Sequence, residues 1–571
     1  MSNHPLLQGA RGERHLLLGN EAIVRGALEA GVHMVSCYPG TPSSEVPDTF
    51  HRLGGEGRYR LEYSVNEKVA LEVAAGAALG GAMSLVTMKH VGVNVAADPL
   101  FTSSYTGVNA GLVVVTADDP AMHSSQNEQD SRNYALAAKL PMFEPADAAQ
   151  AREFTRAAFE LSEAYDTPVL LRSATRLSHS TGVVEVDEDA PAPQRHALGF
   201  NAQPSKYVMI PGNARRRRLD IAARWQRLTD AVETHPANSV EHAPGEVGVI
   251  TSGVAYQYVK EVMPQAGVCR LGIVHPLPRR LITEFARQYR TVYVVEELDP
   301  VIETQVRAWG IDCHGKDVFP SIGEFSPGTL RTALGLPQPE PIGDATVEVP
   351  PRFPALCVGC PHAHVYNALR ERGMIVSGDI GCYSLGVMPP YSAMDTLLDM
   401  GASVTMAHGM DAVLSNDPSA PGQTGKPQIA AVIGDSTFAH SGLTGLLNAC
   451  WNKRDGLYIV LDNGTTAMTG GQPNPLSGER LGREDAMHLD YGYLARAFGI
   501  PDENFAAVDA NSRKAVTAAI DDLAPRSGVR LLAVIGMCII EVKDLKKIDK
   551  YVDKRDARRL EITEVKEHSH A

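Results

Sequence analysis

The sequence is short of the features that mark several large classes of protein. It has only eight cysteines in 571 residues. That is too few for a disulfide scaffold, so their positions have to be interpreted for metal binding or catalysis. Acidic residues outnumber basic ones, and the net charge of −14 argues against general nucleic-acid binding. The one dense basic cluster, Arg215 to Arg218, fits a solvated face or a contact between domains.

Long hydrophobic runs are also missing. Residues 1–15 contain no extended apolar segment of a signal peptide, and the longest apolar runs, such as residues 531–540, are too short to span a bilayer. The sequence therefore predicts no membrane span and a cytoplasmic location. No internal repeat of about 20 to 50 residues stands out. Because single cores stop growing near about 250 to 300 residues, we expect several domains.

Apolar, strand-like runs alternate with helical patterns over residues 16–190, and the alternation resumes after residue 245. This order is typical of parallel sheets with crossover helices, so the predicted fold class is α/β. A helix is expected over residues 219–234. The predicted divisions are an α/β domain over 1–195, a connector over 196–244, a smaller α/β domain over 245–340, a linker over 341–354, a third α/β domain over 355–542 and a charged tail over 543–571.

Three polar loops follow predicted strands in the first domain. Parallel sheets bind their ligands at the carboxyl ends of their strands, which is where such loops lie. Residues 37–45 place Thr41 at the start of a helix, which suits a substrate carboxylate or a simple N-cap turn equally. Glu67 opens a helix of small residues, and a solvated first-turn glutamate is its default interpretation. Residues 116–132 form a long polar loop, which could bind a ligand or equally contact another subunit.

In the third domain, two apolar runs end in polar residues that suit a metal-bound diphosphate. The first run ends in Gly434 and Asp435, and the second ends in Asp462 and Asn463. Gly434 allows a diphosphate to approach the backbone, and the following helix offers free N–H groups. Asp435 and Asn463 are hard oxygen ligands suited to Mg²⁺. On these residues alone, a plain strand, turn, helix and strand is the simpler interpretation.

Four cysteines lie in informative positions. Cys357 and Cys360 form a CxxC pair, and Cys382 and Cys538 follow later in the same domain. A CxxC pair alone has many meanings, and a buried cysteine is often only a small hydrophobe. The other four lie in apolar or unpatterned surroundings and are interpreted as structural: Cys37, Cys269, Cys313 and Cys450.

Eight motifs occur in order along the chain: YPGTPSSE, NEKVALEVAAGAALGG, MKHVGVNVAADP, CVGCPH, GDIGCYSLG, MDTLLDMGAS, GDSTFAHSG and LDNGTTAMTGGQP. With them, residues 15–540 resemble the large (alpha) subunits of indolepyruvate ferredoxin oxidoreductases, in the 2-oxoacid:ferredoxin oxidoreductase superfamily. The resemblance implies two thiamine-diphosphate-binding-type parallel-sheet domains, for the pyrimidine and the diphosphate, with a smaller transketolase-C-like α/β domain between them.

The resemblance also implies roles for single residues. Asp435, Asn463 and the carbonyl of Thr465 would hold Mg²⁺, and Glu67 would bind the aminopyrimidine ring and assist loss of the thiazolium C2 proton. Thr41 would meet the substrate carboxylate. The diphosphate would be lined by Gly434, Ser436 and Thr437, with Ser436 in place of the usual second glycine. A [4Fe–4S] cluster would be held by Cys357, Cys360, Cys382 and Cys538.

For five further positions the implication is less specific. Lys89 and His90 lie where the family's strand-end loop approaches the cofactor, with undefined roles. For His362, His408 and Met468, cofactor contact and ordinary packing remain equal alternatives.

The implied reaction is oxidative decarboxylation of an aryl 2-oxoacid of the indolepyruvate or phenylpyruvate class. Electrons would pass through the cluster to ferredoxin or another acceptor, and coenzyme A would receive the acyl group. A beta subunit and an α2β2 assembly are expected. Family alpha subunits usually carry a C-terminal ferredoxin-like domain, whereas no cysteine follows Cys538 here, so the exit of electrons is open. A non-oxidative thiamine-dependent decarboxylase or carboligase is the alternative, and Glu67, Asp435 and Asn463 argue against a non-catalytic scaffold.

Overall fold

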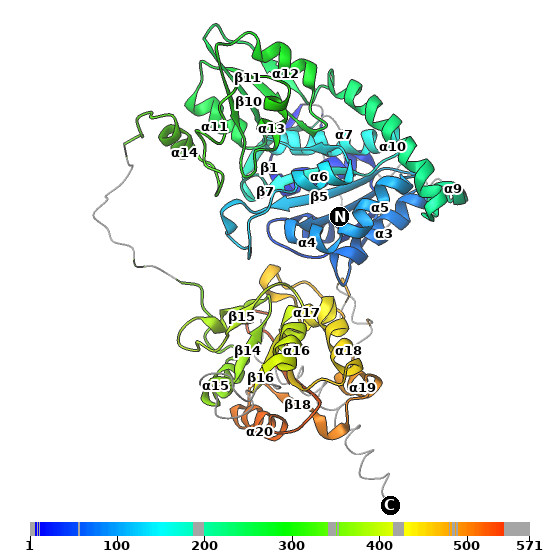
Figure 1. The fold of residues 1–571 in the computed structure, drawn as a ribbon, viewed down its shortest axis with the longest axis vertical. Helices are drawn as coiled ribbons and strands as arrows, with labels where there is room; N and C mark the ends of the chain where they lie inside the picture. The colour runs from blue at the N-terminus through cyan, green and yellow to red at the C-terminus, as the bar shows by residue number, and fades with distance from the viewer. Residues whose placement is uncertain are drawn as a thin grey trace, which may run out of the picture. The chain divides into compact units, whose positions relative to one another are not determined.

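The chain forms two compact units in the computed structural model, residues 1–345 and residues 346–571 (Figure 1). The predicted tail over 543–571 lies outside the described residues, as does most of the predicted linker. The structure describes residues 6–7, 9–10, 12–54, 58–186, 199–340, 350, 353–414, 428–478, 480–481, 486 and 489–541.

A seven-stranded sheet with the order β12-β6-β7-β5-β4-β2-β3 forms the centre of the first unit. All its strand pairs are parallel except β12 with β6. Every residue of β4, β5 and β7 is buried, as expected of a parallel sheet covered on both faces. The strands are β2 Met34–Cys37, β3 Arg60–Tyr63, β4 Ser84–Lys89, β5 Leu112–Asp118, β6 Met142–Phe143, β7 Val169–Ala174 and β12 Ile273–His275.

Helices cover both faces of this sheet. Val113 and Val115 of β5 share one core with α1 and α7, whereas Val114 shares the other core with α3, as the two-residue period of a strand requires. A separate antiparallel ribbon pairs β1 Glu13–Leu18 with β8 Thr181–Val186. The helices are α1 Gly19–Ala30, α2 Glu45–Leu53, α3 Glu67–Leu79, α4 His90–Val95, α5 Ala97–Thr106, α6 Arg132–Ala138, α7 Ala148–Tyr165 and α8 Thr175–His179.

A smaller sheet with the order β13-β10-β11-β9 completes the first unit. Its strands are β9 Ser239–Glu241, β10 Val247–Ser252, β11 Gly267–Leu271 and β13 Thr291–Val295. The accompanying helices are α9 Pro204–Tyr207, α10 Pro211–Val232, α11 Ala255–Val262, α12 Arg279–Ala286, α13 Val301–Ala308 and α14 Pro327–Ala333.

The structure corrects two details of the sequence prediction in this region. The helix expected over 219–234 is α10, which begins at Pro211 and runs along the outside of the unit (Figure 1). Proline at the first helical position is favourable because the missing N–H has no partner there anyway. The apolar run after residue 267 is split at Gly272 between β11 of the small sheet and β12 of the large one. The proposed domain boundaries within this unit stay a prediction.

Buried charges join the two sheets of the first unit. Arg132 donates to Asp130 and, at 2.5 Å from Nη1, to Glu296, which directly follows β13 of the small sheet. Arg172 pairs with Asp118 and Glu144 within the large sheet, and Glu144 in turn accepts from the hydroxyl of Ser252 in β10 at 2.9 Å. Because removing one partner of a buried pair leaves an uncompensated charge, these contacts fix how the two sheets pack.

The second unit is built on a six-stranded parallel sheet with the order β15-β14-β16-β17-β19-β18. Leu457, Ile459 and Leu461 of β17 belong to one core, and Tyr458 and Val460 belong to the core on the other face. The strands are β14 Ile375–Gly378, β15 Thr396–Leu397, β16 Ile429–Gly434, β17 Gly456–Asp462, β18 Phe505–Asp509 and β19 Val529–Ile535. The helices are α15 Ala363–Glu371, α16 Ala402–Leu414, α17 Asp435–Thr437, α18 Leu443–Trp451, α19 Tyr491–Ala497 and α20 Arg513–Leu523, with a π-helical turn over Phe438–Gly442.

These parallel sheets in both units confirm the predicted α/β fold class. In the described part of the chain, none of the helices combines the length and the apolar character needed to cross a bilayer.

Candidate active site

Four residues predicted from the sequence lie at the carboxyl edge of the seven-stranded sheet. Thr41 follows β2, Glu67 follows β3, and Lys89 and His90 stand at the end of β4. Since β3, β2 and β4 are neighbours in the sheet, the fold brings these loops to one edge. This is the edge at which open parallel sheets bind their ligands.

Glu67 is the first residue of α3, and it is only 4% exposed. The default interpretation as a solvated first-turn glutamate is therefore wrong. Asn66 caps the helix by accepting from the N–H of Val69 at 2.9 Å, which fixes where Glu67 enters the helix. The Glu67 carboxyl lies against Gly92 of α4, where a Cβ would sit 2.6 Å from Glu67 Oε1. Gly92 was not identified from the sequence, because its importance arises only from this contact.

The long polar loop after β5 packs onto Lys89 and His90. Lys89 Nζ donates to the Ser124 carbonyl at 2.6 Å, and a ring nitrogen of His90 lies 3.3 Å from the Asn127 carbonyl. Burial lowers the pKa of Lys89 to about 8, with the charge of Asp119 opposing this shift. Burial also lowers the pKa of His90.

Thr41 is connected to the same loop through its backbone. The hydroxyl of Ser124 lies 3.5 Å from the Thr41 carbonyl oxygen. Gly40 packs so closely on Lys89 that a Cβ at position 40 would be 3.0 Å from the lysine Cβ. The strand-end loops of β2, β4 and β5 thus contact one another around the Lys89 side chain.

In the second unit, Asp435 and Asn463 follow adjacent parallel strands. Gly434 of β16 is in register with Leu461 of β17, so the two strand ends lie side by side. Asp435 is 2% exposed. Its carboxylate accepts from the N–H of Ser436 at 2.8 Å and from the N–H of Gly464 at 3.1 Å. One carboxylate therefore orders both strand-end loops.

The loops beside Asp435 are held by further polar contacts. Thr466 donates to the Ser436 hydroxyl at 3.0 Å, and Thr437 donates to the Ile380 carbonyl at 3.0 Å. At Gly434, a Cβ would lie 2.5 Å from a ring carbon of Tyr383, so a side chain is excluded there. The glycine is therefore required at this strand end by the Tyr383 ring.

The donor set at this edge suits Mg²⁺. Asn463 is held by the N–H of Thr465, which donates to its side-chain oxygen at 3.0 Å. Asp435, Asn463 and the Thr465 carbonyl offer only hard oxygen ligands, and Mg²⁺ usually completes its shell with water and phosphate oxygens. No group of three or more His, Cys, Asp and Glu side chains in the described part of the chain is arranged for a single metal ion. A site with two side-chain ligands falls outside that search, so the magnesium site stays a prediction.

The four cysteines of the predicted cluster gather in the second unit. Cys382 follows β14, and Cys538 follows β19 and donates its N–H to the Asn463 carbonyl at 3.1 Å. Cys357 and Cys360 share a tight turn, with Cys360 N–H donating to the Cys357 carbonyl at 3.0 Å. Burial, followed by the charges of Cys538, Cys357 and Cys360, raises the pKa of Cys382 to about 11. The four thiols are thus close enough to influence one another electrostatically. Among the described residues they do not form a group that converges on one metal ion, and the four-iron cluster stays a prediction.

The remaining predicted residues contact packing neighbours. His362 is buried, with its Nε2 3.2 Å from the Val534 carbonyl of β19. A ring nitrogen of His408 lies 3.3 Å from the Asn448 side chain, between α16 and α18. Met468 is 49% exposed. These contacts favour the packing interpretation of His362 and leave His408 and Met468 as predictions.

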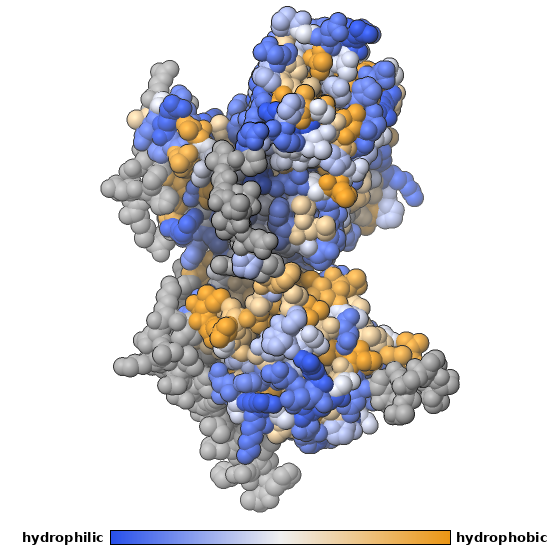
Figure 2. All heavy atoms as spheres, turned by 90° about the vertical axis from the view of Figure 1, so that its left-hand side faces the viewer, coloured by the Kyte–Doolittle hydropathy of each residue, from blue (hydrophilic) through white to orange (hydrophobic). Residues whose placement is uncertain are grey.

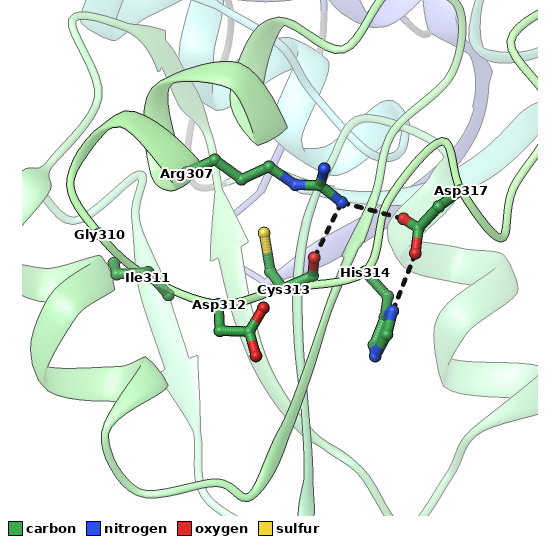
Figure 3. A pocket seen from close by; sticks show the side chains of 7 residues that line it. All are labelled: Arg307, Gly310, Ile311, Asp312, Cys313, His314 and Asp317. Carbon is green, nitrogen blue, oxygen red and sulfur yellow. Dashed lines mark hydrogen bonds and ion pairs between the residues drawn. The ribbon is translucent and has the colours of Figure 1, made fainter.

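A pocket of about 400 Å³ lies beside the loop that follows α13 (Figure 3). Arg307 donates to Asp317 at 3.1 Å and to the Cys313 carbonyl at 3.0 Å, and Asp317 also bonds His314 at 2.9 Å. These groups bond to one another, and the pocket contains none of the residues predicted to be functional. We assign it no part in the site.

Comparison with known proteins agrees with this geometry. Residues 25–235 match the family described as pyruvate flavodoxin/ferredoxin oxidoreductase, thiamine diP-binding, and residues 379–534 match the thiamine pyrophosphate enzyme, C-terminal TPP-binding domain. Each sheet edge with predicted site residues thus falls within a thiamine-diphosphate-binding family.

Full-length relatives give the same assignment. The chain is 43% identical over 502 residues to the indolepyruvate oxidoreductase subunit IorA of Archaeoglobus fulgidus, covering 83% of this chain and 79% of that one. The IorA subunit of Methanothermobacter thermautotrophicus is 42% identical over 528 residues, with 88% and 83% covered. That of Pyrococcus abyssi is 43% identical over 500 residues, with 82% and 77% covered. The chain therefore belongs to the family of indolepyruvate oxidoreductase IorA subunits, among the 2-oxoacid:ferredoxin oxidoreductases.

Proposed function

We propose that this chain is the thiamine-diphosphate-binding subunit of an enzyme that oxidatively decarboxylates an aryl 2-oxoacid of the indolepyruvate or phenylpyruvate class. The product would be the acyl-CoA, with coenzyme A as co-substrate. The observation that carries the proposal is a buried glutamate, Glu67, at one parallel-sheet edge and the Asp435 and Asn463 pair at another. Both edges lie in regions that match thiamine-diphosphate-binding families.

The second unit would hold the charged end of the cofactor. Asp435, Asn463 and the Thr465 carbonyl would bind Mg²⁺, which in turn would bind the diphosphate oxygens. Gly434, Ser436 and Thr437 would line the diphosphate. In support, Asp435 is pre-oriented by the N–H groups of both strand-end loops, so little ordering remains when the metal binds.

The first unit would hold the pyrimidine end. The Glu67 carboxyl would share a proton with a ring nitrogen of the aminopyrimidine, which promotes proton removal from the thiazolium C2. When bound, thiamine diphosphate supplies a carbon nucleophile for the keto group and an electron sink for the carbon dioxide that leaves. Burial of Glu67 against Gly92 supports this role, because it restricts the carboxyl to one position.

Electrons would leave through a [4Fe–4S] cluster held by Cys357, Cys360, Cys382 and Cys538. The hydrogen bond between the Cys538 N–H and the Asn463 carbonyl supports a cluster beside the cofactor, because it joins a cluster ligand to the proposed magnesium ligand. Ferredoxin or a partner subunit would accept the electrons.

A beta subunit would complete the enzyme, with α2β2 as the proposed assembly. The known IorA relatives are named as subunits. Figure 2 shows apolar side chains gathered on the surface of the second unit. Val413 of α16 is 67% exposed and Trp451 at the end of α18 is 83% exposed. Exposed apolar surface of this kind is typical of protein interfaces.

An anaerobic assay of the chain co-purified with its beta subunit tests the proposal. Indolepyruvate and coenzyme A should reduce a viologen dye, with no reduction when coenzyme A is left out. Iron and sulfide analysis should give about four of each per chain. Release of the aldehyde without dye reduction would instead identify a non-oxidative thiamine-dependent decarboxylase. The Asp435→Ala variant is the negative control for both outcomes.

A further inference from the structure

A buried lysine stands at the carboxyl edge of the seven-stranded sheet without a direct counter-ion. Lys89 is 8% exposed. Its ammonium donates to the Ser124 carbonyl at 2.6 Å and lies 3.5 Å from the Ser124 hydroxyl. Among the described residues, no carboxylate lies within ion-pair distance of this ammonium. A lysine has three N–H donors, so most of its bonding capacity remains for another group.

Asp119 is a carboxylate whose charge influences Lys89, and its oxygens already bind the loop. Asp119 accepts from the N–H of Ser124 at 2.8 Å and from the Ser125 hydroxyl. Its other oxygen accepts from the Thr175 hydroxyl at 2.7 Å. Asp119 therefore sets the position of the Ser124 carbonyl, and through it the position of the Lys89 ammonium.

The other buried cations near this edge are already neutralised. Arg172 pairs with Asp118, and Arg132 pairs with Asp130 and Glu296. Both arginines are buried, and the charge of each is already compensated by these carboxylates. Lys89 is different because burying an ammonium is costly unless an anion or several hydrogen-bond acceptors surround it. The observed surroundings supply one short hydrogen bond.

The Thr41 backbone is connected to the same ammonium through Ser124. The Ser124 hydroxyl is 3.5 Å from both the Thr41 carbonyl oxygen and Lys89 Nζ. Gly40 packs against the lysine Cβ, which restricts the side chain between the loops of β2 and β5. An anion bound to Lys89 would therefore lie at the sheet edge that also carries Thr41 and Glu67.

We infer that Lys89 binds the carboxylate of the substrate and that Asp119 is a positioning residue that aims it through Ser124. This inference rests on the proposed function, since a 2-oxoacid brings one carboxylate to this edge. It assigns to Lys89 the selection of acids over neutral carbonyl compounds. Asp119 would act on the substrate only through the loop.

Two ligands that cannot react test whether Lys89 recognises a carboxylate, independently of the decarboxylation reaction. Phenyllactate carries the carboxylate but no keto group, and phenyllactamide is its neutral counterpart. Calorimetric titration into the complex with thiamine diphosphate and Mg²⁺ should show phenyllactate binding about 10- to 100-fold tighter than the amide, as expected for a charge-assisted hydrogen bond. Lys89→Met should abolish that preference, and Lys89→Arg should retain most of it.

Two further variants complete the design. Lys68→Met removes an exposed lysine of α3 that pairs with Glu72, and it should leave the preference unchanged. Asp119→Asn should reduce the preference without removing the ammonium, because an amide has only one of the two accepting oxygens that Asp119 uses to hold the loop of Ser124. Binding of thiamine diphosphate, measured first for every variant, reports whether the protein is folded.

The outcomes distinguish this inference from the function on which it rests. An unchanged preference in a folded Lys89→Met protein would overturn the inference. A loss of C2 proton exchange in thiamine diphosphate bound to Lys89→Met would also overturn it, because Lys89 would then act on the cofactor. If instead the wild-type complex shows no C2 exchange while Lys89→Met still removes the carboxylate preference, the anion site stands and the proposed function fails.

Discussion

Replacing Gly92 by alanine would move the proposed catalytic glutamate without removing it. A Cβ at this position would lie 2.6 Å from both Cγ and Oε1 of Glu67. Ordinary contact begins at 3.4 Å, so the carboxyl has to shift by about 0.8 Å. A misplacement of about 1 Å in a catalytic group can cost about 10²-fold in rate. We therefore expect Gly92→Ala to slow C2 proton exchange about 10²-fold.

The same substitution should not unfold the protein. Gly92 lies inside α4, and alanine is favoured over glycine in a helix by about 0.5–1 kcal/mol. Gly76→Ala provides a matched control, because Gly76 lies inside α3, the helix that Glu67 opens, and a Cβ there would meet nothing within 4 Å. The control should exchange at the wild-type rate.

The assay is hydrogen–deuterium exchange at C2 of thiamine diphosphate bound to the complex, followed by acid quench and NMR. It reads proton removal directly, before any substrate binds. A Gly92→Ala protein that binds the cofactor and exchanges within about twofold of the wild type would refute the assignment of Glu67, since a displaced carboxyl cannot keep a positioned proton transfer at full rate.

Three other variants or conditions test separate parts of the account. Asp435→Ala should weaken Mg²⁺-dependent binding of thiamine diphosphate at least about 10- to 100-fold in calorimetry, and unchanged affinity would remove Asp435 from the magnesium site. Arg132→Met should destabilise the chain by about 3–5 kcal/mol in chemical denaturation, because it leaves Asp130 and Glu296 buried without a counter-charge. Arg372→Met, which breaks a surface pair, should change stability little, and equal effects would contradict the role given to burial. Affinity for phenyllactate should be constant at neutral pH and fall about tenfold per unit above pH 8, because the pKa of Lys89 is lowered to about 8 and only its protonated form attracts an anion. The pKa values of Asp119 and His90 are both lowered, so neither titrates in that range, and a profile without a break near 8 would count against Lys89.

The site residues at the strand ends could be predicted from the sequence, because a parallel strand ends in a loop at the ligand-binding edge of its sheet. Gly434, Asp435 and Asn463 directly follow apolar runs, so their placement needed no long-range information. Glu67 needed the resemblance, because a first-turn glutamate is otherwise expected in solvent. Its burial comes from α4, which packs across it through Gly92.

What the sequence did not reveal depends on contacts between distant segments. The sequence identified the loop after β5 as polar. It did not indicate that the Ser124 and Asn127 carbonyls of this loop would contact Lys89 and His90. The ion pair of Arg132 with Glu296 joins positions 164 residues apart, and no local pattern marks it. The split of one apolar run between β11 and β12 has the same origin, since β12 pairs with β6. Periodicity indicates a strand but does not identify its partner.

The central claim is that two parallel-sheet edges bind the two ends of one thiamine diphosphate. An experimental structure of the complex with thiamine diphosphate and Mg²⁺ tests it most directly. The account predicts Mg²⁺ on Asp435 and Asn463, and a Glu67 carboxyl, from the same chain or from a second copy, within hydrogen-bond distance of the aminopyrimidine ring. A bound cofactor with no Glu67 at its pyrimidine, or with its metal away from Asp435, would contradict the account.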